Sequence, residues 1–202
     1  GAYGQVEAEE PDAAGDPAMI FRYSPWSNGA VWSLNPNPNL PASPNAATIN
    51  WNSTIKSQLY STNPAVGRDG EYLDSLDGYV TADVNLDRSH FAVSTVPLTF
   101  TTDSRKPAIP KGLALYEFTR WISDDLHSIG RLMFANAVPR RFGYLAPCLD
   151  VMGCEDNWMP AGSYVPTAHS TMAYWRTRSG SKPYLMLMNT DFNNFGPHVT
   201  KY

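Results

Sequence analysis

Residues 70–77, Gly70-Glu-Tyr-Leu-Asp-Ser-Leu-Asp77, carry a short apolar pair that runs directly into two carboxylates. Three later stretches repeat this pattern, each of them a compact apolar run that ends in Asp, Asn or Glu: 131–136, 148–155 and 183–189. Short continuous apolar runs are typical of buried parallel strands, and the carboxyl ends of such strands are where α/β proteins place their chemistry. The sequence therefore predicts a parallel sheet with polar side chains gathered at one edge.

A helix between two of these runs supports the same fold class. Apolar residues recur at helical spacing over 112–129, Gly130 provides a stop, and the apolar run 132–135 follows at once. This order is the second half of a βαβ crossover, which makes neighbouring strands parallel. The other expected elements are a strand over 18–23, a long irregular segment over 24–44, a helix over 48–60, a polar connection over 79–111, and a helix capped by Thr167 and closed by Gly180.

An α/β fold of the (β/α) TIM-barrel type is the expected architecture. The open, doubly wound alternative usually shows a glycine-rich phosphate loop after a strand, and the chain contains no such motif. A complete barrel takes about 250 residues, so with 202 residues we expect an incomplete barrel and a fragment of a longer enzyme. Residues 1–17 are expected to be a loop or a truncated end, and residues 18–202 a partial barrel that forms the catalytic domain.

Composition argues against two classes of partner. The net charge is −4 and only 17% of the residues are charged, so the chain has no basic surface on which to bind nucleic acid. No apolar run reaches the length of about 18 residues that a membrane span needs. Aromatic residues reach 12%, and their flat rings suit the faces of sugars, although packing explains most individual aromatic residues.

Neither a metal nor a cofactor is expected. The four histidines form no HxH or HExxH motif. The stretch Asp83-Val-Asn85-Leu-Asp87 begins like a calcium loop, but Arg88 and Ser94 stand where the loop needs glycine and a closing acid, which leaves only some other oxygen-ligand site as an alternative. The two cysteines lack CxxC spacing and are expected to be free thiols.

Asp74 and Glu155 are the first choices for catalytic residues. Cleaving a glycosidic bond takes one acid to protonate the leaving oxygen and a second carboxylate to meet the charge at the sugar carbon. Asp74 closes a predicted strand and suits a nucleophile, with a helix cap as the competing interpretation. Glu155 suits the acid/base because Trp158 could partly desolvate it, while Asp150 and Asp156 remain alternatives. This hypothesis requires the strand ends at 74 and 155 to lie side by side at a common hollow.

Further polar and aromatic residues are candidates for substrate contacts. Trp26, Asn28 and Trp32 lie in the proline-rich segment, where structureless length is typical of a functional loop, although the tryptophans could equally pin that loop down. Amides and carboxylates at strand ends can hydrogen-bond sugar hydroxyls, and ordinary turns use the same residue types. The candidates at strand ends and in the loops after them are Asp77, Asn136, Trp158 and Asn189.

The run Asp69-Gly-Glu-Tyr-Leu-Asp74 resembles a family pattern. It is similar to the fourth strand of barrel glycosidases around the α-galactosidases and the endo-α-N-acetylgalactosaminidases, in which a D-G-x-Y-L-D-like run ends in the nucleophilic Asp. The resemblance implies a TIM barrel with Asp74 as nucleophile and Glu155 or Asp150 as the acid on strand six. In the endo-acetylgalactosaminidases the acid follows strand five, where this chain carries Asn136.

The sequence thus predicts a retaining glycoside hydrolase that acts on an oligosaccharide, a polysaccharide or a glycoconjugate. One alternative is a non-catalytic carbohydrate-binding or scaffold protein of the same fold, with Trp26, Trp32 and Trp158 stacking on sugars. A second alternative is a barrel lyase or hydrolase that binds a cation through Asp83, Asn85 and Asp87. The oligomeric state and the cellular location stay open, with a secreted or periplasmic location favoured.

Overall fold

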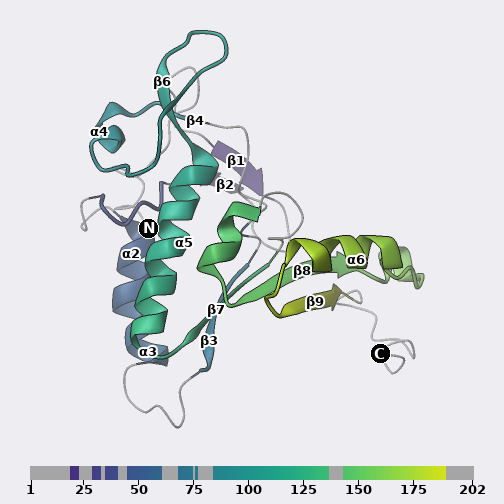
Figure 1. The fold of residues 1–202 in the computed structure, drawn as a ribbon. Helices are drawn as coiled ribbons and strands as arrows, with labels where there is room; N and C mark the ends of the chain where they lie inside the picture. Colours follow the sequence, from purple (N-terminus) through teal and green to yellow (C-terminus); the bar gives the residue numbers. More distant parts are fainter. Residues whose placement is uncertain are drawn as a thin grey trace. The chain divides into compact units, whose positions relative to one another are not determined.

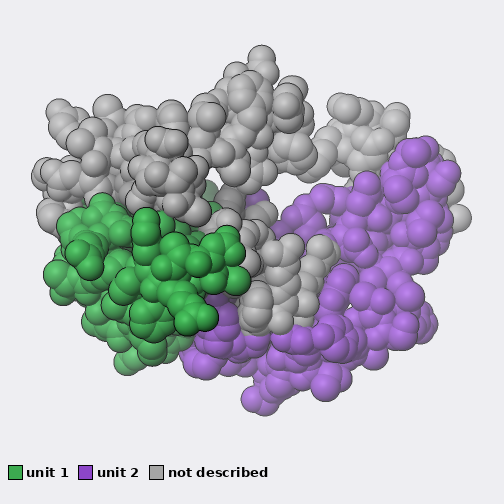
Figure 2. Space-filling model, turned by 90° about the horizontal axis from the view of Figure 1, so that it is seen from above, with its two compact units in different colours: residues 1–68, 79–124 green, residues 69–78, 125–202 purple. Residues whose placement is uncertain are grey.

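A computed structural model describes most of the chain (Figure 1). The described residues are 19–22, 29–32, 35–40, 45–60, 68–74, 76, 84–136 and 143–189. The expected end segment 1–17 and the predicted contact residues Trp26, Asn28 and Asp77 lie outside them. The chain divides into two compact units, which Figure 2 colours separately. Unit 1 comprises residues 1–68 and 79–124, and unit 2 comprises residues 69–78 and 125–202.

Unit 2 contains a parallel sheet of four strands, coloured from blue through green to yellow in Figure 1. Its strands are β3 (Gly70–Leu73), β7 (Leu132–Ala135), β8 (Val151–Asn157) and β9 (Tyr184–Asn189). They lie in the order β3-β7-β8-β9, and every neighbouring pair is parallel. The four apolar runs therefore form the four strands of one parallel sheet, as predicted.

One face of this sheet forms the core of unit 2. The side chains of Met133, Ala135, Met152 and Cys154 are completely buried there. Because side chains alternate between the two faces of a strand, the residues between these four point to the other face. That second face carries half-exposed and polar side chains, so the two faces of the sheet differ in both burial and polarity.

Strand β8 is longer than its sequence predicted. The apolar run stops at Met152, and the strand was expected to end near Gly153. The ladder with β9 instead continues to the pair Asn157 and Asn189, because backbone pairing does not require apolar side chains and β9 supplies a partner along its full length. Glu155 consequently lies within the strand and not in the loop that follows it.

Gly153 allows the ring of Phe134, on β7, to lie directly over the backbone of β8. A Cβ at this position would lie 2.2 Å from Cε2 of Phe134 and 2.6 Å from the carbonyl oxygen of Ala135. The ring of Phe134 fills the place that a side chain at 153 would take, and it packs against Tyr72 at a centroid distance of 4.8 Å. The absence of a side chain therefore shapes the polar face of the sheet.

The helices broadly follow the sequence. Helix α5 (Lys111–Ser128) matches the predicted 112–129 and is followed by Gly130 with a positive φ of 69°. Ile122 and Leu126 are buried as expected, but Ile129 is exposed, and the buried surface of α5 also includes Glu117. Residues 46–59 are helical as α2 (Ala46–Ile49), a wider π-helical turn η1 (Asn50–Lys56) and α3 (Ser57–Leu59). The shorter turns of 3₁₀ type are η4 (Gly143–Cys148) and η5 (Pro160–Gly162).

Helix α6 (His169–Arg178) was expected to carry Thr167 as its N-cap, and this is wrong. Ala168 occupies the capping position. The Thr167 hydroxyl instead donates a hydrogen bond to Asp156 and accepts one from Trp158. The Thr167 oxygen, which a helix cap would use, is therefore engaged in contacts with Asp156 and Trp158. The helix ends before Gly180, as predicted, and that glycine has a positive φ of 63°.

Unit 1 holds antiparallel strands that the sequence did not predict. Strand β1 (Met19–Arg22) confirms a strand within 18–23, but it pairs antiparallel with β2 (Gly29–Trp32) inside the segment expected to be irregular. The expected polar connection forms a second antiparallel sheet, ordered β4-β6-β5, and the short helix α4 (Arg88–Phe91). Its strands are β4 (Val84–Asn85), β5 (Thr99–Phe100) and β6 (Pro107–Pro110). Strands this short give too little periodic pattern for a sequence to reveal them.

Candidate active site

The four strand ends of unit 2 bring together four residues predicted from the sequence. Asp74 and Asn136 directly follow β3 and β7, while Glu155 and Asn189 lie in the last part of β8 and β9. The register pairs Leu73 with Ala135 and Asn157 with Asn189. Because side chains alternate along a strand, this register directs all four to the same face of the sheet.

Asn136 connects the two predicted catalytic carboxylates. Its Nδ2 donates to Oδ1 of Asp74 over 3.0 Å and to Oε2 of Glu155 over 2.6 Å. The side chain of Asn136 is only 2% exposed, so this bridge is held in place by the surrounding protein. The two carboxylate oxygens are separated by no more than the sum of these two distances. The two carboxylates therefore lie close together at the end of β7, which separates β3 from β8 in the sheet.

Asn189 completes the hydrogen bonding of Glu155. Its Nδ2 donates to Oε1, the oxygen that Asn136 leaves free. Both oxygens of Glu155 thus accept a hydrogen bond from an amide, while Glu155 itself is half-buried. Among the described residues, neither Asp74 nor Glu155 forms an ion pair with Lys, Arg or His. Two carboxyl groups are therefore held close together by neutral donors.

Tyr72 is a site residue that the sequence reasoning missed. Its hydroxyl donates to Oδ1 of Asp74 over 3.1 Å. Burial raises the pKa of the Tyr72 phenol well above its usual range, and the charges of Asp74 and Glu155 raise it further, so the hydroxyl stays protonated as a donor. Tyr72 stands two positions before Asp74 on the same strand and hence on the same face, which is the signal that could have identified it.

Asp150 lies at the opposite end of β8 from Glu155. Its Oδ2 pairs with Nε2 of His127 at 2.8 Å and accepts a hydrogen bond from the backbone N–H of Met133 at 2.7 Å. Burial by itself would raise the pKa of this carboxyl. The two hydrogen bonds and the charges of His127 and Lys182 outweigh burial and hold the pKa below its usual value. The structure does not bring Asp150 to the other candidates.

Asp156 and Trp158 face away from Glu155. The regular ladder of β8 places them on the other side of the sheet, where the Thr167 hydroxyl joins them. The indole Nε1 of Trp158 donates to this hydroxyl over 2.9 Å, and the side chain is 9% exposed. The sequence suggested that Trp158 shields the Glu155 carboxylate from water, but Trp158 is not placed to do so. Trp32 belongs to unit 1, where its backbone pairs with Met19.

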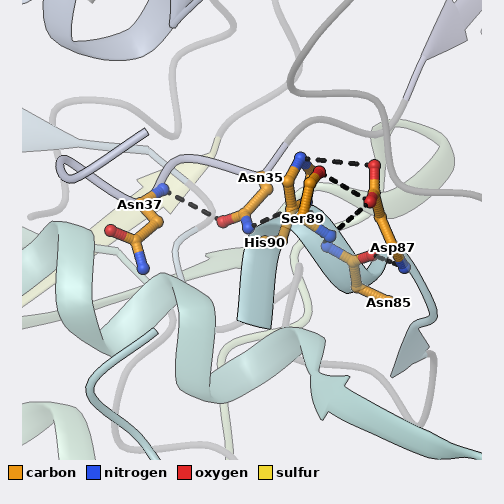
Figure 3. Close-up of polar contacts among 6 residues, drawn as sticks. All are labelled: Asn35, Asn37, Asn85, Asp87, Ser89 and His90. Atoms are coloured by element: carbon orange, nitrogen blue, oxygen red, sulfur yellow. Dashed lines mark hydrogen bonds and ion pairs between the residues drawn. The ribbon is translucent and has the colours of Figure 1, made fainter. Parts of the chain in front are cut away.

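The residues of the possible cation site have local structural roles (Figure 3). Oδ1 of Asn85 accepts a hydrogen bond from the backbone N–H of Asp87. The Asp87 carboxylate caps α4 by accepting a hydrogen bond from the backbone N–H of Ser89. Nδ2 of Asn85 lies 2.7 Å from Nδ1 of the buried His90, and Nδ2 of Asn35 lies 3.3 Å from the same nitrogen. Because an amide nitrogen can only donate, Nδ1 of His90 acts as an acceptor. Asp83 lies outside the described residues.

The described residues show neither a metal-binding cluster nor a membrane-spanning helix. They contain no group of three His, Cys, Asp or Glu side chains arranged to hold a metal ion. They also include no helix with the length and apolar character needed to cross a membrane. Comparisons of the chain with protein-family models, with curated proteins and with solved structures found no match in any of the three.

Proposed function

We propose that this protein is a glycoside hydrolase that cleaves its substrate with Asp74 and Glu155. The observation that carries the proposal is the position of both carboxylates within hydrogen-bond distance of one nitrogen, Nδ2 of Asn136. Glycosidases use a pair of neighbouring carboxyl groups that flank the scissile bond. The pair lies at the carboxyl ends of parallel strands, where α/β enzymes collect catalytic residues.

The spacing of the two carboxylates favours retention of configuration. Retaining glycosidases hold their carboxyl groups about 5 to 5.5 Å apart, whereas inverting ones need about 6.5 to 9.5 Å to admit a water molecule. Here one nitrogen, Nδ2 of Asn136, reaches an oxygen of each carboxyl group, at 3.0 Å and 2.6 Å, which fits the closer spacing. We therefore propose that Asp74 attacks the sugar carbon, and that Glu155 first protonates the leaving oxygen and then activates water. We also propose that the four-stranded sheet is part of an incomplete (β/α) barrel.

The neutral surroundings of the pair also support this function. A positive charge develops at the sugar carbon in the transition state, and the Asp74 carboxylate, which has no cationic partner among the described residues, stabilises it electrostatically. Ion pairing with Lys or Arg would weaken that effect. Asn136 and Asn189 fix the direction of the carboxylates without neutralising them.

A panel of 4-nitrophenyl α- and β-glycosides of the common hexoses, N-acetylhexosamines and fucose tests the proposal. We expect the wild-type protein to hydrolyse at least one of them, and Asp74→Asn and Glu155→Gln to lower kcat/KM by at least about a thousandfold. The matched control is Asp150→Asn, which changes a carboxylate at the far end of the same sheet and should keep most of the activity. Full activity of Asp74→Asn, or no hydrolysis across the panel, would overturn the proposal.

The stereochemical outcome provides an independent check. Proton NMR of the first sugar released should show the same anomeric configuration as the substrate. Azide added to Asp74→Ala should restore turnover and give a glycosyl azide of inverted configuration, because the small anion takes the place of the missing carboxylate. A first product of inverted configuration from the wild-type protein would contradict Asp74 as nucleophile. Binding of sugars without turnover would instead support the carbohydrate-binding alternative.

A further inference from the structure

The two oxygens of Asp74 have different surroundings. Oδ1 accepts two hydrogen bonds, from the Tyr72 hydroxyl at 3.1 Å and from Nδ2 of Asn136 at 3.0 Å. Oδ2 accepts none from the described residues. Glu155 differs in this respect, since both of its oxygens are held by amides. Among the described residues, Oδ2 of Asp74 is therefore the one carboxylate oxygen of the pair that accepts no hydrogen bond.

From this asymmetry we infer that Tyr72 is a positioning residue, which holds Asp74 by Oδ1 and makes Oδ2 the attacking atom. The inference rests on the proposed function. In the first step a lone pair of Oδ2 forms the bond to the sugar carbon, and the bonding pair of the glycosidic bond passes to the leaving oxygen, which takes the proton of Glu155. In the second step Glu155 takes a proton from water, the water oxygen bonds to the sugar carbon, and the carbon–Oδ2 bond breaks.

The hydrogen bond from Tyr72 affects these two steps differently. Oδ1 is a carboxylate oxygen in the free site and the carbonyl oxygen of an ester in the intermediate. A hydrogen bond to a charged acceptor is stronger than one to a neutral acceptor, so Tyr72 stabilises Asp74 most when it is ionised. Asp74 becomes ionised again when it leaves the sugar in the second step. Tyr72 therefore assists the departure of Asp74 and not only its orientation.

The surroundings of Tyr72 fit a fixed donor. Its ring packs against Phe134, whose own position depends on Gly153. Although the Tyr72 side chain is 37% exposed, its partial burial and the nearby negative charges raise the pKa of the phenol, which keeps the proton on the donor in the neutral pH range. Tyr72→Phe removes the hydroxyl and retains the ring, so the substitution isolates the hydrogen bond from the packing.

The test compares Tyr72→Phe with the wild-type protein on the 2,4-dinitrophenyl glycoside of the sugar found in the panel. This leaving group needs little protonation, so the second step limits turnover. We expect kcat to fall about tenfold, KM to fall by a similar factor, and the glycosyl-enzyme to become detectable by intact-protein mass spectrometry. The matched control is Tyr184→Phe, because Tyr184 is on the opposite face of the sheet, where its hydroxyl contacts the Cys154 thiol; its kinetics should stay unchanged.

Each other result has a distinct meaning. Unchanged kinetics of Tyr72→Phe together with an inactive Asp74→Asn would overturn the inference and leave the proposed function standing. A raised KM with unchanged kcat would also overturn it, since Tyr72 would then contact substrate in place of positioning Asp74. A Tyr72→Phe protein without a folded circular dichroism spectrum would show that the phenol serves the fold, against the inference. Full activity of Asp74→Asn would remove the proposed function itself.

Discussion

At the scale of single residues, the central feature is a pair of acidic side chains joined by one buried amide. Asn136 can donate to both carboxylates because its Nδ2 carries two hydrogens. Its Oδ1 is buried and has no hydrogen-bond partner among the described residues, an arrangement that costs free energy. A protein selected for stability alone would gain by replacing one of the carboxylates. Such local strain is a recurrent property of functional sites.

Asp74→Asn and Asp150→Asn should change stability in opposite directions. Asp74→Asn removes one acid of a closely spaced pair and keeps an oxygen that can accept from Tyr72 and Asn136, so we expect the free energy of unfolding at pH 7 to rise by about 1 kcal/mol. Asp150→Asn loses the pairing with His127 and should lower the free energy of unfolding by about 1 kcal/mol. Urea denaturation followed by circular dichroism measures both values. Destabilisation by Asp74→Asn would argue against a strained carboxylate pair.

The effect of Asp150→Asn should depend on pH. The folded-state pKa of Asp150 is lowered, so its contribution to stability is present above its unfolded-state pKa of about 3.9 and is lost as pH falls below it. The difference between wild type and Asp150→Asn should therefore be largest near neutral pH and vanish in acid. A difference that stays constant from pH 7 to pH 3 would exclude this carboxylate as its source.

At the scale of elements, the parallel sheet controls the site through its alternation of faces. The expectation that Asp156 and Trp158 lie in a loop beside Glu155 is wrong, because it placed the end of β8 at Gly153. Once the strand extends to Asn157, alternation assigns Glu155 and Asp156 to opposite faces. Tyr72, two positions before Asp74, falls on the site face by the same rule.

Gly153→Ala should disrupt the packing of β7 against β8. The added Cβ would lie 2.6 Å from a backbone oxygen as well as 2.2 Å from the Phe134 ring, and the backbone cannot move aside as a side chain can. We expect a loss of about 2 to 3 kcal/mol in the free energy of unfolding. The control is Gly143→Ala, where a new Cβ meets nothing within 4 Å and the effect should be within about 0.5 kcal/mol. Equal effects of the two substitutions would contradict the described approach of the strands.

At the scale of the whole molecule, the two units use different interactions for their stability. Unit 2 depends on a parallel sheet with an apolar face. Unit 1 includes a buried polar network, in which Glu117 on α5 accepts from Asn37 at 2.6 Å and from the Thr95 hydroxyl at 2.6 Å. These partners are far apart in the sequence, so no local pattern indicates that Glu117, on a mainly apolar helix face, is buried.

Glu117→Ala should destabilise the protein by about 2 kcal/mol, because the buried amide of Asn37 loses the acceptor of its shorter hydrogen bond, and the backbone N–H and hydroxyl of the exposed Thr95 lose theirs. The matched control on the same helix is Asp124→Ala, whose exposed side chain lies 3.9 Å from Arg120 and should change stability by less than about 0.5 kcal/mol. Thermal and urea unfolding give both numbers. Similar values for the two variants would show that the network does not support the fold.

The sequence by itself determined the four parallel strands, the long helix before β7 and the polar residues at the strand ends, because apolar runs and helical periodicity are local signals. It also named Asp74, Asn136, Glu155 and Asn189. Only the tertiary structure decided that one amide joins the two carboxylates, that Tyr72 shares Oδ1 of Asp74 with it, and that Asp150 belongs to the other end of the sheet. These facts depend on strand register and on contacts between distant residues, which no local pattern encodes.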